Sequence, residues 1–453
     1  MYKKGLGLIM RGYIITIISL FFLTSFGKDA FFTFLAVVLL SWLACILTWK
    51  LRETHRKLSF LAGILGIIGI FIIFILRKTG TGLHTIGLSY YFLMLAGLII
   101  KVIRDGSKPV IDPVKFVGCA AFFPLLIEGP ICDLTELSER LFDSREVGFK
   151  EAFFPAVARF TFGLFKKLVI ADRLAGVTIA LTGSFDFASP AFYLGVFLYS
   201  IRLIADFTGG IDMAISLALL CGVRVPENFA FPLFAASLAD YWKRWHITLS
   251  DWAKTNIFYP LSVALSNSTA FEKISTKTAV RLSVYVSAIM TWVFTGLWHG
   301  ISIWYLLWGL SNAAILLFSY EMRGKVAKFR ESHAFTKTKA YFFFQCIRTF
   351  ILTGALRIFD LLAYRNGSTL QTSATITHKE MFVIFLAVSF ALLVSFISKK
   401  KGKRGTSFYA LIEEKKPAVR LAAILVLLGV TIIFGAYGTG FEISGFIYGK
   451  VAV

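Results

Sequence analysis

Residues 282–320 read LSVYVSAIMTWVFTGLWHGISIWYLLWGLSNAAILLFSY, two long apolar runs that meet at His299. Each run has close to the ~20 residues that an α-helix needs to cross the hydrocarbon core of a bilayer. The sequence therefore predicts two consecutive membrane helices with an imidazole at their junction. At that depth an ionisable group is costly unless it is hydrogen-bonded or takes part in function.

Comparable runs recur over the whole chain. The clearest are Ile14–Phe26, Ala30–Trp49, Leu58–Leu76, Gly82–Ile100, Leu282–Trp298, Ile301–Tyr320, Met381–Ile397 and Leu421–Gly435. Shorter or interrupted runs are Val114–Ile127, Phe153–Ile170, Tyr193–Ala205, Met213–Val223 and Tyr341–Tyr364. Of the 453 residues 57% are hydrophobic and 16% are charged, more apolar surface than one soluble core can bury. We expect an all-α, polytopic integral membrane protein with about ten to twelve transmembrane helices plus re-entrant or interfacial helices. Every polar stretch is loop-sized, so residues 1–453 are expected to form a single membrane-embedded domain.

The net charge of +22 is concentrated in loops between the apolar runs. Basic residues gather at the N-terminus, in Lys50–Lys57, in Lys101–Lys108 and in Lys399–Arg404. Positive loops tend to face the cytoplasm, which favours a cytoplasmic N-terminus. We attribute most of this charge to topology and to attraction of anionic membrane lipids, not to nucleic acid. Binding of an acidic carrier protein or of the phosphates of coenzyme A is the alternative.

The segment Asp206–Leu261 mixes apolar residues with many ionisable ones. Such a segment must be buried in protein or line a wet cavity, because hydrocarbon does not solvate charge. Pro226, Pro232 and the Gly209–Gly210 pair are expected to interrupt any continuous span there. We therefore expect broken or re-entrant helices around a central chamber.

Two histidines are candidates for chemistry. There is no P-loop, H-E-x-x-H or G-x-S-x-G pattern, and no metal-ligand spacing. The near-neutral pKa of His299 suits it to take and return a proton, and Gly296 and Gly300 are expected to leave room for a substrate. A helix-packing histidine bonded to a carbonyl is the alternative. His246 is expected on one helix face with Trp242 and Ser250, at i, i−4 and i+4.

Several ordered segments resemble the membrane-bound O-acyltransferase (MBOAT) family. They are YWKRWHITLS at 241–250, followed by Trp252 and by IFYPL at 257–261, and TGLWHG at 295–300. The others are IEGPI at 127–131, DFTGGIDMAI at 206–215, Asn228–Phe229 with Pro232, and FIY at 446–448. The resemblance runs from about residue 120 to the C-terminus, with a motif-bearing core at about 120–320. One departure is Lys254–Thr255, where the family commonly has Arg-Asp.

The resemblance implies many helices around a central funnel and two catalytic histidines, His299 and His246. It implies a general-base role for His299, with His246 orienting the acyl group or stabilising the oxyanion with Arg244. The candidates for the donor site or tunnel are Arg244, Lys243, Trp245, Trp298 and Asn228. The candidates for structural support are Asp206, Asp240 and Asp212, with Asp240 a partner for a nearby base. No metal or tightly bound cofactor is implied.

The resemblance also implies a reaction. In the bacterial cytoplasmic membrane, an acyl group, most simply acetyl, passes from a cytoplasmic thioester donor to a hydroxyl of an extracytoplasmic polysaccharide or an intermediate carrier. The donor is acetyl-CoA or an acyl-carrier protein, and a second, extracytoplasmic acyltransferase is a further expected partner. The alternatives are D-alanyl transfer to teichoic acid from a carrier protein, a transporter in which His299 relays protons, and an inactive relative that only assembles partners.

Overall fold

The computed structural model describes residues 2–80, 85–144, 147–269, 274–365 and 377–437, and every regular element in these residues is a helix. This confirms the all-α prediction, since backbone polar groups inside a bilayer must be satisfied within the segment. The FIY segment at 446–448 lies outside the described residues.

In chain order the helices are α1 (Tyr2–Thr24), α2 (Lys28–Leu51), α3 (Arg56–Lys78), α4 (Leu88–Asp105), α5 (Pro113–Ala121), α6 (Phe123–Leu126), α7 (Leu134–Ser138), η1 (Glu139–Asp143), α8 (Phe149–Phe165), η2 (Lys166–Ala171), α9 (Asp172–Thr182), α10 (Pro190–Leu220), η3 (Pro232–Phe234), α11 (Leu238–Trp242), α12 (Ile247–Ala253), η4 (Lys254–Phe258), α13 (Tyr259–Ser266), α14 (Thr276–His299), α15 (Ile303–Ser332), η6 (Ala334–Lys337), α16 (Lys339–Arg365), α17 (His378–Lys400), α18 (Tyr409–Ile412) and α19 (Pro417–Phe434). The short elements η1, η2 and η4 are π-helical, and η3 and η6 are 3₁₀-helical.

Seven described helices are long and apolar enough to cross a membrane, namely α2, α3, α10, α14, α15, α17 and α19. The count is below the expected ten to twelve because the predicted runs Tyr193–Ala205 and Met213–Val223 share the one helix α10, the apolar stretch Ile9–Thr24 of α1 is shorter, and another run is divided. The run Val114–Ile127 is divided into α5 and α6, which are separated at Phe122. Pro124 lies in the first turn of α6. A proline there starts a new helix more readily than it continues an old one.

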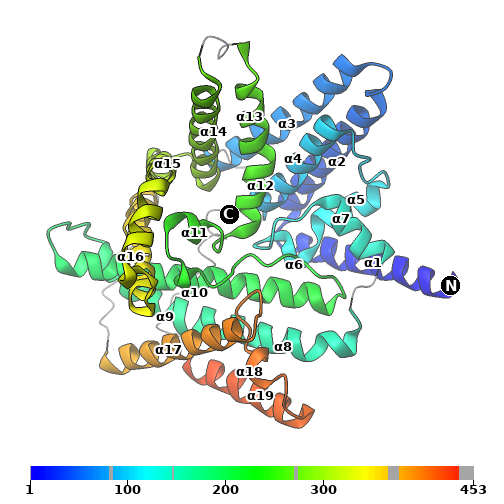
Figure 1. The fold of residues 1–453 in the computed structure, drawn as a ribbon. Helices are drawn as coiled ribbons and strands as arrows, with labels where there is room; N and C mark the ends of the chain where they lie inside the picture. Colours follow the sequence, from blue (N-terminus) through cyan, green and yellow to red (C-terminus); the bar gives the residue numbers. More distant parts are fainter. Residues whose placement is uncertain (1, 81–84, 145–146, 270–273, 366–376, 438–453) are drawn as a thin grey trace.

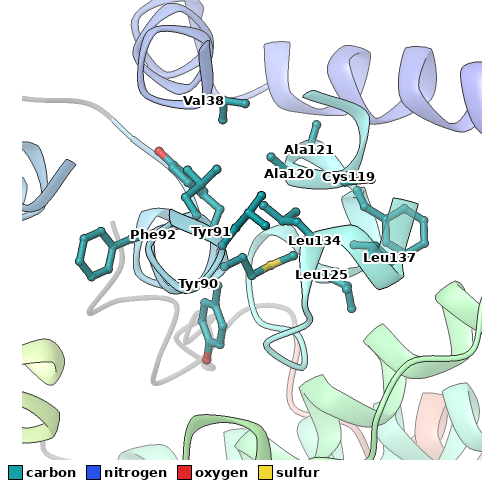
Figure 2. Packing of buried hydrophobic residues seen from close by; sticks show 14 of the residues in the cluster. Val38, Tyr90, Tyr91, Phe92, Cys119, Ala120, Ala121, Leu125, Leu134 and Leu137 are labelled. Atoms are coloured by element: carbon teal, nitrogen blue, oxygen red, sulfur yellow. The ribbon is translucent and has the colours of Figure 1, made fainter. Parts of the chain in front are cut away.

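Helix α4 forms the centre of the N-terminal half. Its residues Leu88–Leu95 are buried in succession, so no face of its first two turns meets solvent or lipid. Figure 2 shows this helix beside Val38 of α2, Ala121 of α5 and Leu134 of α7. A helix that is apolar all round either faces lipid or is enclosed by other helices, and the burial of α4 shows that it is enclosed.

Helix α10 runs across the molecule between two groups of helices (Figure 1). On one side it packs against α8, with α17–α19 beyond (Figure 1). The predicted break at Gly209–Gly210 is wrong, because both glycines lie inside the continuous helix α10. A Cβ on Gly209 would lie 2.9 Å from the carbonyl oxygen of Gly163 in α8, so Gly209 allows the two backbones to approach closely.

The segment after α10 is broken as expected. Residues 221–231 contain no helix, and short pieces follow: η3 at Pro232, then α11 and α12. These pieces lie between α10 and the α14–α16 group in Figure 1. Much of the mixed-polarity segment is thus packed among helices, while Arg224 and Asp251 in it are exposed and line a cavity.

Candidate active site

His299 is the last residue of α14, and the extended residue Gly300 leads into α15. Its side chain is 7% exposed and is surrounded by aromatic rings. The ring centroids of Trp298, Tyr305 and Trp308 lie 4.8, 6.0 and 5.2 Å from that of the imidazole. The Nζ of Lys78, at the end of α3, donates to the backbone carbonyl of His299 at 3.3 Å. The terminus that carries His299 is therefore held by two other helices, α3 and α15.

The two glycines beside His299 serve packing and do not leave the expected open space. A Cβ on Gly296 would lie 2.3 Å from the carbonyl oxygen of Tyr305, and one on Gly300 would lie 2.6 Å from the Tyr305 ring. Helix α15 therefore fills the volume beside both glycines. Their small size allows α15 to turn back directly after His299.

His246 is not helical, unlike the expectation that placed it on one helix face with Trp242 and Ser250. It lies between α11 and α12 with φ 46° and ψ 53°, a left-handed conformation that costs a non-glycine residue about 1–3 kcal/mol. The conformation turns its side chain into the protein, where it is 1% exposed. Strain of this size persists only where the surrounding contacts hold it.

Asn228 supplies those contacts. Its Oδ1 accepts from the backbone N–H of Thr248 at 3.1 Å and from the Thr248 hydroxyl at 2.9 Å. The same oxygen lies 3.2 Å from Nδ1 of His246. The Thr248 N–H fixes which end of the amide is oxygen, so Nδ1 must carry the proton and Nε2 has the lone pair. Burial lowers the pKa of His246 to about 3, which keeps this imidazole neutral.

One indole connects the two histidines. The Trp298 ring centroid lies 6.1 Å from that of His246 and 4.8 Å from that of His299. Its Nε1 donates to the carbonyl of Ser89 near the start of α4 at 3.1 Å. The structure therefore brings His246, Asn228, Trp298 and His299 together from three separate parts of the chain.

The residues just before His246 differ in their surroundings. Trp245 is 1% exposed and packs on Phe207, Phe229 and Tyr241, whereas Lys243 is exposed. Arg244 donates to Asp240 at 2.9 Å and to the carbonyl of Ala230 at 3.2 Å. In this structure Asp240 thus pairs with Arg244 and accepts from the Ala236 N–H, and both contacts brace the turn before His246.

Asp206 and Asp212, both on α10, take part in buried ion pairs. Lys167 of η2 bonds Asp206 at 2.7 Å and Asp172 at 2.8 Å. A second group joins Asp212 to Lys166 at 2.6 Å and to Arg159, which also bonds Glu227. These pairs tie α8, η2 and α10 together. Asp206 precedes Phe207, whose ring centroid is 4.9 Å from that of His246.

Sequence reasoning missed three ionisable residues near the site: Lys78, Glu128 and Arg357. Arg357 on α16 is 4% exposed and bonds Asp360 at 3.1 Å and the Tyr241 hydroxyl at 3.2 Å. Its guanidinium lies 5.5 Å from the centroid of the Trp245 ring. The sequence could have indicated all three, because each is an ionisable residue within or beside a predicted apolar run, and such residues are candidates for a functional site.

A cavity of about 970 Å³ opens beside the site. Its polar lining includes Lys101, Arg104, Arg140 and Arg404 together with Asp133, Glu136, Glu227 and Asp251. Ile131 and Thr248 also line it, and the Ile131 N–H donates to the Thr248 hydroxyl at 3.1 Å. Thr248 in turn bonds Asn228, so two hydrogen bonds lead from the cavity wall to His246.

Comparison with known proteins gives one family and several bacterial relatives. The sequence model of the membrane-bound O-acyltransferase family matches residues 21–362. A probable alginate O-acetylase of Azotobacter vinelandii is 31% identical over 238 residues, which are 52% of this chain and 45% of that protein. A peptidoglycan O-acetyltransferase of Helicobacter pylori is 32% identical, over 46% of this chain and 36% of that protein. A teichoic acid D-alanyltransferase of Bacillus subtilis is 25% identical, over 59% of this chain and 68% of that protein. The matches thus span less than half of the two O-acetylating relatives.

Proposed function

The chain belongs to the membrane-bound O-acyltransferase family, and we propose that it transfers an acetyl group to a hydroxyl of a cell-envelope polysaccharide or of a carrier on the way to one. The supporting observation is the pair of buried imidazoles that contact one indole, inside the segment that the family matches. The names of the relatives support acetyl as the acyl group. Their bacterial sources and the long apolar helices of this chain support the bacterial cytoplasmic membrane as the proposed location.

The proposed chemistry uses His299 as general base. The acceptor hydroxyl gives its proton to His299 while its oxygen attacks the carbonyl carbon of the thioester. The resulting tetrahedral intermediate collapses and expels the thiolate, which takes the proton back from the imidazolium. His246, whose ring is fixed by the contact between its Nδ1 and Asn228, orients the acyl group of the thioester beside His299. Arg244 is held by Asp240, so its part is to support the turn.

The donor enters through the cavity from the cytoplasm in this proposal. The Arg52 guanidinium donates to the carbonyls of Val102 and Ile103, which brings the basic loop Lys50–Lys57 to the end of α4 that lines the cavity. Arg404, from the basic stretch Lys399–Arg404, lines the same cavity. Three basic segments therefore share the face at which the cavity opens, and positive loops face the cytoplasm.

The decisive test is acyl transfer from radiolabelled acetyl-CoA by the protein in lipid nanodiscs. His299→Ala should lower turnover by about 10²–10⁴-fold, the usual effect of removing a general base, while the protein stays folded. His333→Ala is the matched control, because His333 is exposed at the end of α15 and should leave turnover unchanged. Wild-type turnover in His299→Ala would refute the assignment of the base.

A second donor belongs in the same experiment. The Bacillus subtilis relative, of which 68% is covered, is named for D-alanyl transfer. Labelled D-alanyl carrier protein is therefore tested beside acetyl-CoA. Transfer from the carrier alone would replace acetyl by D-alanyl in the proposal, and the role of His299 would be unchanged.

A further inference from the structure

Glu128 is a buried carboxyl that neither the fold nor the proposed mechanism uses. It follows α6, in the turn that leads to Ile131, and is 5% exposed. Neither Oε1 nor Oε2 has a hydrogen-bond partner among the described residues. Buried polar groups are nearly always hydrogen-bonded, so an unpartnered one requires an explanation. A residue kept at a cost to stability is a candidate for function.

The surroundings of Glu128 favour a neutral carboxylic acid. The turn that carries Glu128 packs tightly against the residue before α4, since a Cβ on Gly87 would lie 1.9 Å from the carbonyl oxygen of Leu126. The charged groups that act on Glu128 are Asp206 and Lys167, which already bond each other at 2.7 Å. Burial and the Asp206 carboxylate raise the pKa of Glu128 well above its usual range, and Lys167 opposes this shift. A neutral acid offers one O–H donor and one carbonyl acceptor.

Glu128 lies between the cavity and the histidines along the chain of contacts. Three residues further on, the Ile131 N–H bonds Thr248, and both residues line the cavity. Thr248 bonds Asn228, which contacts His246. On the other side, Asp206 adjoins Phe207, whose ring packs on His246. Glu128 is therefore three residues from the cavity wall at Ile131, and its carboxyl is within electrostatic range of Asp206, the neighbour of the ring that packs on His246.

The residues along this route change from charged side chains at the cavity to aromatic rings near the histidines. The cavity lining carries Lys101, Arg104, Arg140 and Arg404, whose charges suit phosphates, although Lys101 and Arg140 also pair with Asp133 and Glu136 of the same lining. Around His246 the walls are the aromatic rings of Phe207, Trp245 and Trp298, which offer few polar atoms. A molecule with phosphates at one end and a neutral amide chain ending in a thioester matches this order.

We propose that Glu128 binds the acyl donor, its carboxyl forming hydrogen bonds with an amide of the pantetheine arm that brings the thioester to His246 and His299. The inference rests on the proposed function for the presence of a thioester donor. The pantetheine arm is shared by coenzyme A and by acyl-carrier proteins, so the residue serves either source.

The test separates donor binding from stability. Glu128→Leu removes the hydrogen-bonding group at similar volume, Glu128→Gln keeps a neutral donor and acceptor, and Glu139→Leu replaces an exposed glutamate outside the cavity lining. Melting temperature is measured without ligand. Dissociation constants are measured by calorimetry for coenzyme A and, separately, for pantetheine-loaded carrier protein.

Glu128→Leu should melt at or above the wild-type temperature, because it removes an unpartnered buried polar group. It should bind the preferred donor at least tenfold more weakly, while Glu128→Gln stays within about threefold of wild type and Glu139→Leu is unchanged. Unchanged binding in Glu128→Leu, a lower melting temperature in that variant, or a wild type that binds neither probe would overturn the proposal. Because binding is read without turnover, donor binding without acyl transfer would count against the proposed function and not against Glu128.

Discussion

A single amide oxygen decides the geometry of His246. Oδ1 of Asn228 takes three contacts, two from Thr248 and one from the imidazole, and holds a residue with positive φ in place. Asn228→Ala should leave the Thr248 N–H unpaired and release the His246 tautomer. We expect the specificity constant for acyl transfer to fall about tenfold or more, since a buried hydrogen bond lost on one side costs about 1–3 kcal/mol. Steady-state kinetics measures the specificity constant, and Asn267→Ala, at an exposed position, is the control. A tenfold lower specificity constant in the control, or an unchanged one in Asn228→Ala, would contradict the role of Asn228.

The sequence indicated both histidines as candidates, and that assignment stays a prediction, but it did not describe their surroundings. His299 was identifiable because an imidazole between two apolar runs is expensive, and that argument needs no tertiary contacts. The conformation of His246 was missed, because helical spacing carries no information on a turn held by Asn228, eighteen positions earlier. Glu128 and Arg357 were missed for a similar reason, because they are distinguished only by tertiary contacts. Arg357 bonds the distant Tyr241 hydroxyl, and the Glu128 carboxyl is buried without a hydrogen-bond partner among the described residues.

At the scale of elements, the ion pairs between η2 and α10 hold the part of α10 that carries Phe207, whose ring packs on His246. Lys167 forms ion pairs with two carboxylates, Asp172 and Asp206, and all three side chains are buried. Lys167→Met should destabilise the protein by about 3–5 kcal/mol, because it leaves uncompensated buried charge. Thermal unfolding in detergent measures the effect, and Lys150→Met, at the exposed start of the adjoining helix α8, is the control. An unchanged melting temperature for Lys167→Met would show that the pair carries little stability.

Element type was predictable from the sequence, whereas element continuity was not. Long uncharged runs gave helices throughout the described residues, because no other open backbone structure satisfies its own polar groups in a bilayer. Breaks were predicted wrongly at Gly209–Gly210 and correctly at Pro226 and Pro232. Proline removes a backbone donor wherever it stands, but a glycine can also serve close helix packing, and only the neighbour, here Gly163, distinguishes the two uses.

For the whole molecule, charge placement and cavity position together define an orientation. The basic loop Lys50–Lys57 is bonded through Arg52 to the end of α4 beside the cavity, and the opposite end of α3 carries Lys78 toward His299. If the cavity admits a cytoplasmic thioester, the first end of α3 must face the cytoplasm and the second the outside. The two histidines then lie between a donor side and an acceptor side, as transfer across a membrane requires.

Two exposed residues at the ends of α3 test this orientation directly. His55→Cys and Thr79→Cys each place a thiol in an exposed position, whereas native Cys45, Cys119 and Cys346 are buried. With a membrane-impermeant maleimide, Thr79→Cys should be labelled in intact cells, and His55→Cys should react only after lysis. The unsubstituted protein gives the background from its own cysteines. The reverse pattern would put the basic cavity face outside, and the proposed entry of a cytoplasmic thioester through the cavity would then be wrong.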